Sequence, residues 1–198
     1  MSAHEQLEHA EHIEHISSAN KKIALLISVL ALFLAFSETL GKSAQTTAIT
    51  DNVTANDLWA FFQAKTIRIT VLNTAAEQMQ IEAERATDAE AKARLAKTID
   101  TWKKNVARYE DDEKSNEGRK QLMERAKQAE ESRELALSRY HNYEFASAAF
   151  QIGIVLASAE VITNIAALGW LSGALGVLGL VLTGLGLWAP HALHVLMH

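Results

Sequence analysis

The chain has 198 residues, a net charge of −5 and no cysteine, and 48% of its residues are hydrophobic. Without cysteine, disulfides, thiolate catalysis and Cys-based zinc sites are excluded. The mild, mixed charge argues against a nucleic-acid surface. The hydrophobic residues gather in three blocks, whereas the middle of the chain is rich in Ala, Glu, Lys and Arg, which favour helix. The one proline, Pro190, follows the last block, so the composition predicts an all-α fold.

Residues 1–22 form a polar head in which Glu and His recur every three residues. On a helix, His9, His12 and His15 would lie close enough together to share a metal ion. A solvated amphipathic helix supported by Glu–His pairs also explains the pattern. We favour that interpretation, because no closed ligand set with the usual spacing is visible.

Residues 23–40 are predicted to be the first transmembrane helix, at the short end of the length that crosses a bilayer. A cleaved signal peptide is the competing interpretation, but the residues before Glu38 make a poor cleavage site. Glu38 lies near the end of this span and four residues before Lys42, so we expect an ion pair there at the membrane interface.

Residues 41–86 are predicted to be a linker followed by an amphipathic helix. Aromatic and basic residues on successive turns of that helix suit the membrane–water boundary. These residues are Trp59, Phe61, Phe62, Lys65 and Arg68. Ordinary helix core is an equal alternative, because Phe62 also shares an apolar stripe with Leu58 and Ile69. An unbroken outward helix from residue 57 would be about 80 Å long. That is twice the length of its expected partner, so we expect the segment to lie along the membrane.

Residues 87–144 are predicted to form an antiparallel, coiled-coil-like helical hairpin. A capping pattern at Thr87-Asp88-Ala89-Glu90 indicates a helix start, and apolar residues with heptad spacing follow it. The acidic stretch at 110–118 reads as a turn, because it lacks the ligand spacing and central glycine of a calcium loop. The outgoing and returning helices would be about 33 Å and 40 Å long, a fair match.

Residues 145–168 and 169–188 are predicted to be the second and third transmembrane helices, followed by a tail at 189–198. Small residues bring membrane helices together, and the candidates for helix packing are Gly153, Gly169, Gly173, Gly176 and Gly179. Trp170 and Trp188 bracket the third span as interface anchors. His191, His194 and His198 in the tail are further weak metal candidates.

Glu160 is predicted near the middle of the second span, where an ionisable side chain costs about 2.5 kcal/mol or more on insertion scales. Bonded to Asn164, to Thr163 or to a partner helix, it would hold spans together. In an oligomeric pore it would serve as a proton or cation step, with Glu38 as a second acid. We favour the structural role, because relays usually contain more than one deeply buried charge.

The topology predicted is three spans with the helical domain inserted between the first and the second. Lys21 and Lys22 lie on the N-terminal side, and five basic residues lie within about 20 residues of span ends on the domain side. Those five are Lys42, Arg125, Lys127, Arg133 and Arg139. This asymmetry favours a cytoplasmic central domain, although the lysine pair beside the first span is a counterweight.

The segment Trp59-Ala60-Phe61-Phe62-Gln63-Ala64-Lys65-Thr66-Ile67-Arg68 resembles an aromatic-Gln-Ala-Lys segment of a bacterial membrane protein family, domain of unknown function 4337 (DUF4337). The resemblance extends over nearly the whole chain, from the polar head to the closing pair of spans. It implies a three-span protein of the bacterial inner membrane. It supplies no activity, cofactor or catalytic residue.

Three functions remain open on the sequence alone. The first, which we favour, is a non-enzymatic homo-oligomer that acts as a structural or interaction scaffold through its helical hairpin, with membrane lipids as its surroundings. The second is an oligomeric ion or proton channel that uses Glu160, and the third is a metal-binding protein that uses the histidines. No motif of a hydrolase or transferase is present, so neither a catalytic residue nor a cofactor is expected.

Overall fold

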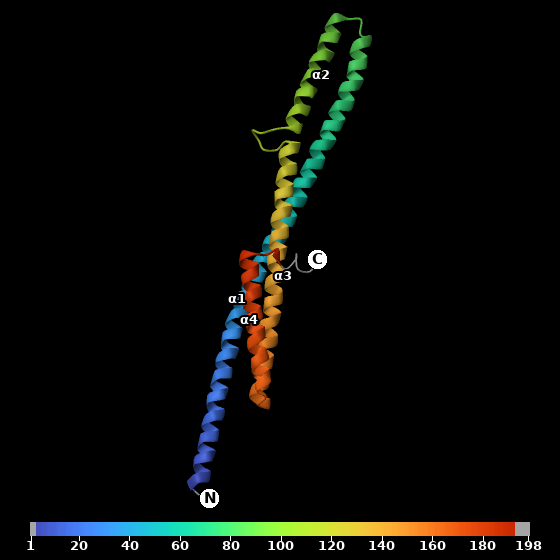
Figure 1. Cartoon of the computed structure of the whole chain (residues 1–198). Coiled ribbons are helices and arrows are strands. Elements are labelled where there is room, and N and C mark those ends of the chain that lie inside the picture. Colours follow the sequence, from blue (N-terminus) through green and yellow to red (C-terminus); the bar gives the residue numbers. More distant parts are fainter. Residues whose placement is uncertain (1–2, 193–198) are drawn as a thin grey trace. The chain divides into compact units, whose positions relative to one another are not determined.

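The computed structural model describes the backbone of residues 3–192 and the side chains of residues 21–192. This part of the chain is all helical and contains no strand. Its four helices are α1 (Ala3–Arg85), α2 (Ala89–Glu110), α3 (Arg119–Thr163) and α4 (Ala166–Trp188) (Figure 1). Three of them, α1, α3 and α4, are long and apolar enough to cross a membrane. The chain divides into unit 1, residues 1–48 and 134–198, and unit 2, residues 49–133.

Residues 41–56, where the sequence predicts a linker, are helical and belong to α1. Hydroxyl side chains in this stretch bond back to carbonyls four residues earlier, as Thr47 Oγ1 does to Ser43 at 3.1 Å and Thr54 Oγ1 to Thr50 at 2.9 Å. Such bonds give the Ser and Thr hydroxyl groups a hydrogen-bond acceptor within the helix itself. Ala48 and Ala55 are also buried, so packing on one face supports the helix where composition alone suggested a linker.

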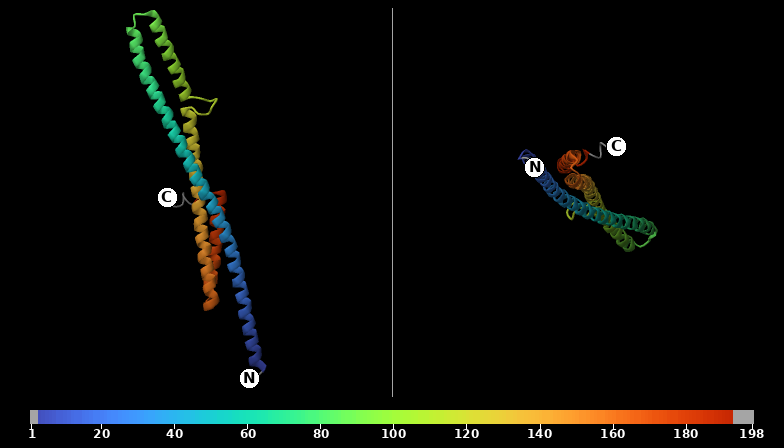
Figure 2. Two further views of the ribbon diagram at one scale, coloured as in Figure 1. Left: turned by 180° about the vertical axis from the view of Figure 1, so that it is seen from behind. Right: turned by 90° about the horizontal axis from the view of Figure 1, so that it is seen from below.

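In unit 2 the chain reverses after Arg85, and α2 runs back along α1 (Figures 1 and 2). Asp88 is the N-cap of α2, and its carboxylate accepts hydrogen bonds from the backbone N–H of Glu90 at 3.3 Å and of Ala91 at 2.9 Å. This confirms the predicted helix start. The N-cap is one residue later than a Thr87–Glu90 capping box requires.

Residues 111–118 form a loop that leaves the end of α2 and returns beside it, where α3 begins. Glu110 pairs with Arg119 at 2.8 Å, and Asp111 pairs with Lys120 at 2.8 Å. Gly118 lies so close to Asp111 that a Cβ there would be 2.9 Å from the Asp111 Cα, which leaves room only for glycine. The end of α2 and the start of α3 are therefore adjacent, and the loop does not reverse the chain.

The helices of unit 2 pair differently from the predicted hairpin. We expected 87–109 to pair with 119–144, but α2 and the first turns of α3 follow one another along α1. Residues 49–85 span about 55 Å, while α2 and residues 119–133 span about 33 Å and 22 Å. The outgoing helix and the return path therefore match in length, and the overshoot that suggested an interfacial helix does not arise.

The core of unit 2 joins α1 to the start of α3. Leu58, Leu122 and Ala126 form a buried cluster, with the aromatic residues of α1 packed against it. The Ser132 hydroxyl donates to the Asp51 carboxylate at 2.6 Å, which fixes the antiparallel register at the other end of the contact.

In unit 1, α3 and α4 form a hairpin against α1 (Figure 2). Leu30 of α1, together with Ala146 and Phe150 of α3, forms the buried cluster, and Leu182 of α4 packs against it. Helix α3, which contains the second predicted transmembrane span, ends at Thr163, whereas the sequence predicts the end of that span at Leu168. Asn164 has a φ of 54°, and its N–H donates to the Glu160 carbonyl at 2.8 Å. Asn adopts this left-handed conformation more readily than most residues, and it ends helices there.

Candidate functional site

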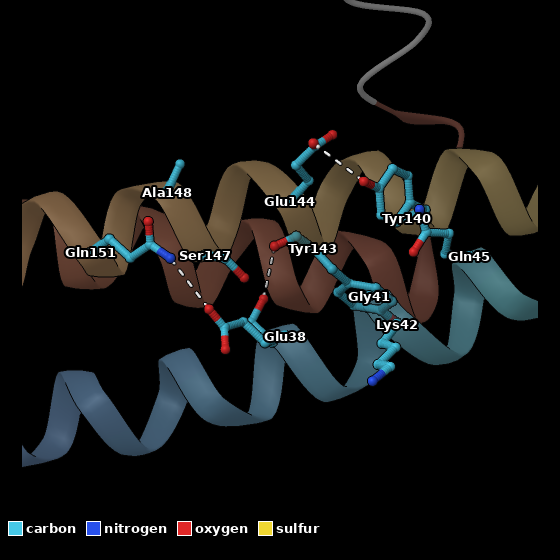
Figure 3. A pocket seen from close by; sticks show the side chains of 11 residues that line it. Glu38, Gly41, Lys42, Gln45, Tyr140, Tyr143, Glu144, Ser147, Ala148 and Gln151 are labelled. Carbon is cyan, nitrogen blue, oxygen red and sulfur yellow. Dashed lines mark hydrogen bonds between the residues drawn. The ribbon is translucent and has the colours of Figure 1, made fainter.

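A pocket of about 450 Å³, lined largely by residues with polar side chains, lies between α1 and α3 in unit 1 (Figure 3). The α1 residues recur at three- and four-residue steps and so share one face of that helix, and those of α3 do the same. The lining residues are Ser37, Glu38, Gly41, Lys42, Gln45, Tyr140, Tyr143, Glu144, Ser147, Ala148 and Gln151.

Each carboxylate of this pocket is bonded by a neutral side chain, and His141 Nδ1 also lies 3.5 Å from Glu144 Oε2. Gln151 Nε2 donates to Glu38 Oε1 at 3.2 Å, and the Tyr140 hydroxyl donates to Glu144 Oε1 at 3.3 Å. The sequence predicts an ion pair between Glu38 and Lys42, but within the described residues Glu38 is bonded to Gln151 and makes no ion pair with Lys42 (Figure 3). The carboxylate of Glu38 is thus bonded across the helix pair rather than along its own helix.

The pocket offers hydrogen bonds rather than a nucleophile. The Ser37 hydroxyl is buried and donates to the backbone carbonyl of Tyr143 at 3.0 Å, so it ties α1 to α3. Neither histidine nor cysteine lines the pocket to activate a hydroxyl. The arrangement suits hydrogen bonding between the two helices. It also suits binding of a small polar group beside the end of the apolar segment of α1.

Glu160 lies in the last turn of α3, about 5 Å along the axis from its end, and not near the middle of the helix. Its carboxylate faces Gly169 of α4, where a Cβ would lie 2.6 Å from the Glu160 Cδ. It borders a groove of about 620 Å³ that is also lined by Lys22 and Trp170. The prediction of a mid-span acid depended on a helix continuing to Leu168, and the break at Asn164 removes that premise.

The residues predicted to bond Glu160 are engaged in the turn itself. Asn164 ends α3, as described above, and the Thr163 hydroxyl donates to the Ala159 carbonyl at 2.9 Å. The small residues of α3 beside this turn do face α4: Gly153 and Ala157 are buried, and the Ser172 hydroxyl donates to the Gly153 carbonyl at 2.7 Å.

The five candidate packing glycines fall into three environments. Gly153, Gly176 and Gly179 lie at close helix contacts, since a Cβ on them would be 3.3 Å from Leu30 Cδ1, 2.7 Å from Leu30 Cδ2 and 2.6 Å from Phe150 Cε1. Gly169 faces the Glu160 carboxylate. A Cβ on Gly173 would meet nothing within 4 Å. The contact stripe of α4 therefore contains Ser172, Gly176, Gly179 and Gly186, and Gly173 lies beside it.

The aromatic and basic segment of α1 packs inside unit 2, as the helix-core interpretation expects. Trp59 Nε1 donates to the Glu130 carboxylate at 2.8 Å, and Phe61 and Phe62 pack against the core cluster. Lys65 is only 6% exposed, and its ammonium lies 5.1 Å from the Phe61 ring centroid and 5.0 Å from that of Tyr109. Arg68 is exposed. Trp170 and Trp188, at the two ends of α4, are 82% and 86% exposed.

The histidine candidates bring together no metal site within the described residues, where no group of three potential ligands occurs. The side chains of His9, His12 and His15, and all of His194 and His198, lie outside the described part of the chain. His191 Nδ1 lies 3.5 Å from the Ser138 hydroxyl.

Several buried polar residues were missed in the sequence. Ser37 and Ser172 are completely buried, and Asn142, which is 1% exposed, donates to the Pro190 carbonyl at 3.0 Å. A signal was present, since Ser37 lies seven residues after Leu30 and Ser172 four before Gly176. Small polar residues in register with a packing stripe are candidates for inter-helix hydrogen bonds.

Comparison with protein families matches residues 19–189 to the family described as Domain of unknown function (DUF4337). Comparison with curated proteins and with solved structures found no match. The family match covers all four helices apart from the first part of α1.

Proposed function

The chain belongs to the DUF4337 family, and from that premise we propose that it is a non-enzymatic, homo-oligomeric integral membrane protein. In this proposal unit 1 is the membrane anchor, and unit 2 is a coiled-coil-like scaffold for assembly or docking. Neither a cofactor nor a catalytic residue is part of the proposal.

The anchor is supported by what unit 1 presents at its surface. Large apolar side chains point outward from all three helices, among them Leu25 of α1 at 66%, Val155 of α3 at 66% and Val177 of α4 at 62% exposed. Leaving each such side chain in water forgoes about 1.5–3 kcal/mol of burial free energy. A lipid environment accommodates these residues without further protein contacts.

The single observation that carries the scaffold is the spacing of the buried positions along α1. They recur in steps of three, four and seven residues, which is the heptad spacing of coiled coils. The positions are Leu30, Ser37, Gly41, Ala48, Ala55, Leu58, Lys65, Ile69, Ala76 and Ala83. A helix with this regularity is suited to long helix–helix contacts rather than to enclosing a substrate.

The location we propose is the bacterial inner membrane, with unit 2 in the cytoplasm. Its support is the excess of basic residues near the span ends on the unit 2 side, where Arg125, Lys127 and Arg139 are exposed. Labelling of single cysteines introduced at exposed positions of unit 2, in intact cells and in opened cells, tests this orientation.

Two measurements test the proposal as a whole. Membranes are washed at high pH, and the protein should stay with the lipid. Two copies with different affinity tags are then co-expressed and solubilised in mild detergent, and purification through one tag should recover the other. Release by the wash would contradict the anchor, and recovery of a single tag would contradict the assembly.

A further inference from the structure

A column of uncharged side chains runs along the outer face of α1 in unit 2. Its members are seven residues apart: Val53, Ala60, Ile67, Thr74 and Ile81. All five are exposed, and the three largest are 54%, 63% and 51% exposed respectively. We call these five residues the outer column.

The neighbours of the outer column extend it into an apolar stripe. Ile49 and Val71 lie within about 40° of Ile67 around the helix axis, and both are 60% exposed. Asn56 and Gln78 lie within the same arc and are uncharged. Between residues 49 and 81 this face therefore carries no Lys, Arg, Asp or Glu along its centre, and Arg85 follows on the same line at the end of α1.

The other exposed surfaces of unit 2 differ in this respect. Solvent-facing positions of α2 are occupied by charged residues such as Lys92, Lys97 and Lys103. The chain thus has charged residues available for solvated helix faces and does not place them on the outer column. Contiguous exposed apolar surface of this kind marks an interaction site.

The opposite face of α1 is already occupied. Leu58, Ile69 and Ala76 are buried there against the return path formed by α2 and the start of α3. The outer column is therefore not the face that folds the unit. It is a second face of α1, and its seven-residue spacing keeps its members along one side of the helix.

We propose that the outer column packs against the outer column of a second copy of the chain, with the two α1 helices parallel. This rests on the proposed function, because copies inserted in one membrane with one topology have their α1 helices pointing the same way. The exposed Ile and Val side chains of this face are Ile49, Val53, Ile67, Val71 and Ile81. Burying all five completely would remove about 100 Å² apiece, or roughly 1,000 Å² for the pair, which is the lower bound for a biological interface.

A parallel pair brings each column residue next to its own counterpart, and this gives a sharp test. The chain contains no cysteine, so single substitutions can be cross-linked without background. Val53→Cys, Ile67→Cys and Ile81→Cys are each expressed in the full chain, and the membranes are oxidised mildly. Each variant should form disulfide-linked dimers several-fold more efficiently than the controls.

The controls are exposed positions off the column. Asn73→Cys lies on the same helix about 120° around from Ile67, and Lys97→Cys lies on the charged face of α2. Ile67→Cys lies at the middle of the column and would cross-link in either helix direction. Val53→Cys and Ile81→Cys cross-link singly only in a parallel pair, so cross-linking of these two with each other and not with themselves would overturn the proposal.

A second variant keeps the test independent of disulfide geometry. Ile67→Lys adds a charge at a side chain that is 63% exposed, so helix content should be unchanged while recovery of the differently tagged partner falls several-fold. Asn73→Lys should leave recovery unchanged. Recovery of both tags without cross-linking in any column variant would overturn the outer column as the interface and leave the scaffold standing. Capture of a photoactivatable phospholipid by the column, in place of a second copy, would identify the lipid surface as its occupant and likewise overturn the proposal.

Discussion

Glycines at the α3–α4 contact set how closely these helices approach each other. A Cβ on Gly179 would lie 2.6 Å from the ring of Phe150, which is 1% exposed and has little room to move. Overpacking of this kind costs about 1–3 kcal/mol. We therefore expect Gly179→Ala to lower the thermal stability of the detergent-solubilised protein.

The matched control for this substitution is Gly173→Ala on the same helix, where a Cβ meets nothing within 4 Å. It should be neutral or slightly stabilising, because alanine has the higher helix propensity. Equal losses in the two variants would contradict the assignment of the effect to the contact with Phe150.

Glu160 is the residue whose interpretation changed most. An acid in the last turn of α3 lies near the groove that Lys22 borders, and it is poorly placed to pass an ion through the middle of a bilayer. We expect liposomes containing the protein to show no proton or cation flux that depends on Glu160, whether tested as the native chain or as Glu160→Gln. A conductance abolished by Glu160→Gln would restore the channel hypothesis.

The individual residues differ in how far sequence could place them. Gly153, Gly176 and Gly179 were identified as packing residues because small side chains stand out in an apolar run. The hydrogen bond from Gln151 to Glu38 could not be predicted, because these residues lie 113 positions apart and meet only through the register of α1 on α3. Local patterns identify a packing face, but long-range register determines which side chains meet across it.

At the scale of the helices, the structure and the sequence pattern name different N-cap residues for α2: Asp88 in the structure and Thr87 in the pattern. The Asp88 carboxylate accepts two N–H bonds, so Asp88→Ala should destabilise unit 2 by about 0.5–2 kcal/mol. Thr87→Ala should have little effect, although Thr87 is the capping residue that the sequence pattern indicates. Chemical unfolding followed by circular dichroism compares the stability of the two variants. A larger loss of stability for Thr87→Ala than for Asp88→Ala would show that Thr87, and not Asp88, caps the helix.

The loop at 111–118 should open in acid. The hydrogen bond from Lys120, followed by that from Gln121, lowers the pKa of Asp111 below its ordinary value of 3.8, and the Ser115 N–H lowers the pKa of Asp112. A carboxyl with a lowered pKa in the folded state stabilises the fold above its unfolded pKa. That contribution is lost as the pH falls through the folded value.

Amide hydrogen exchange, corrected for the intrinsic rate at each pH, measures this opening. Protection around residues 111–121 should decline below about pH 4. Amide protection around the exposed ion pair of Asp100 and Lys104 in α2 is the internal comparison. It should decline less than the protection of the loop over the same pH range. Asp111→Asn should already show reduced protection of the loop at neutral pH, because the charged carboxylate is absent. Protection of the loop that is unchanged down to pH 2 in the native chain would contradict this account.

The boundaries of the helices show where local reasoning succeeds. The start of α2 and the loop at 111–118 were predicted because caps and charged turns are local. The continuous run of α1 through residues 41–56 was not, because burial of Ala48 and Ala55 against other helices outweighs the polar composition. The end of α3 depends on one Asn in a left-handed conformation, which a hydropathy pattern does not detect.

For the whole molecule, the fold class and the number of apolar helices followed from composition, and the family followed from a resemblance over nearly the full chain. The helix pairing within unit 2 did not follow from the sequence, because the sequence contains two helix breaks, at 86–88 and at 111–118. Only one of them reverses the chain. The sequence pattern predicts the reversal at the strongly charged loop, whereas the hydrogen bonds of Asp111 and the close approach of Gly118 to it close this loop on itself.

The central claim is that this chain is a membrane-anchored protein that assembles with copies of itself. Its most direct test is the mass of the purified protein in mild detergent or in lipid nanodiscs, measured by native mass spectrometry over a wide range of dilution. We predict a defined multiple of the 21.8 kDa chain that carries bound lipid. A mass of one chain at every concentration would contradict the account.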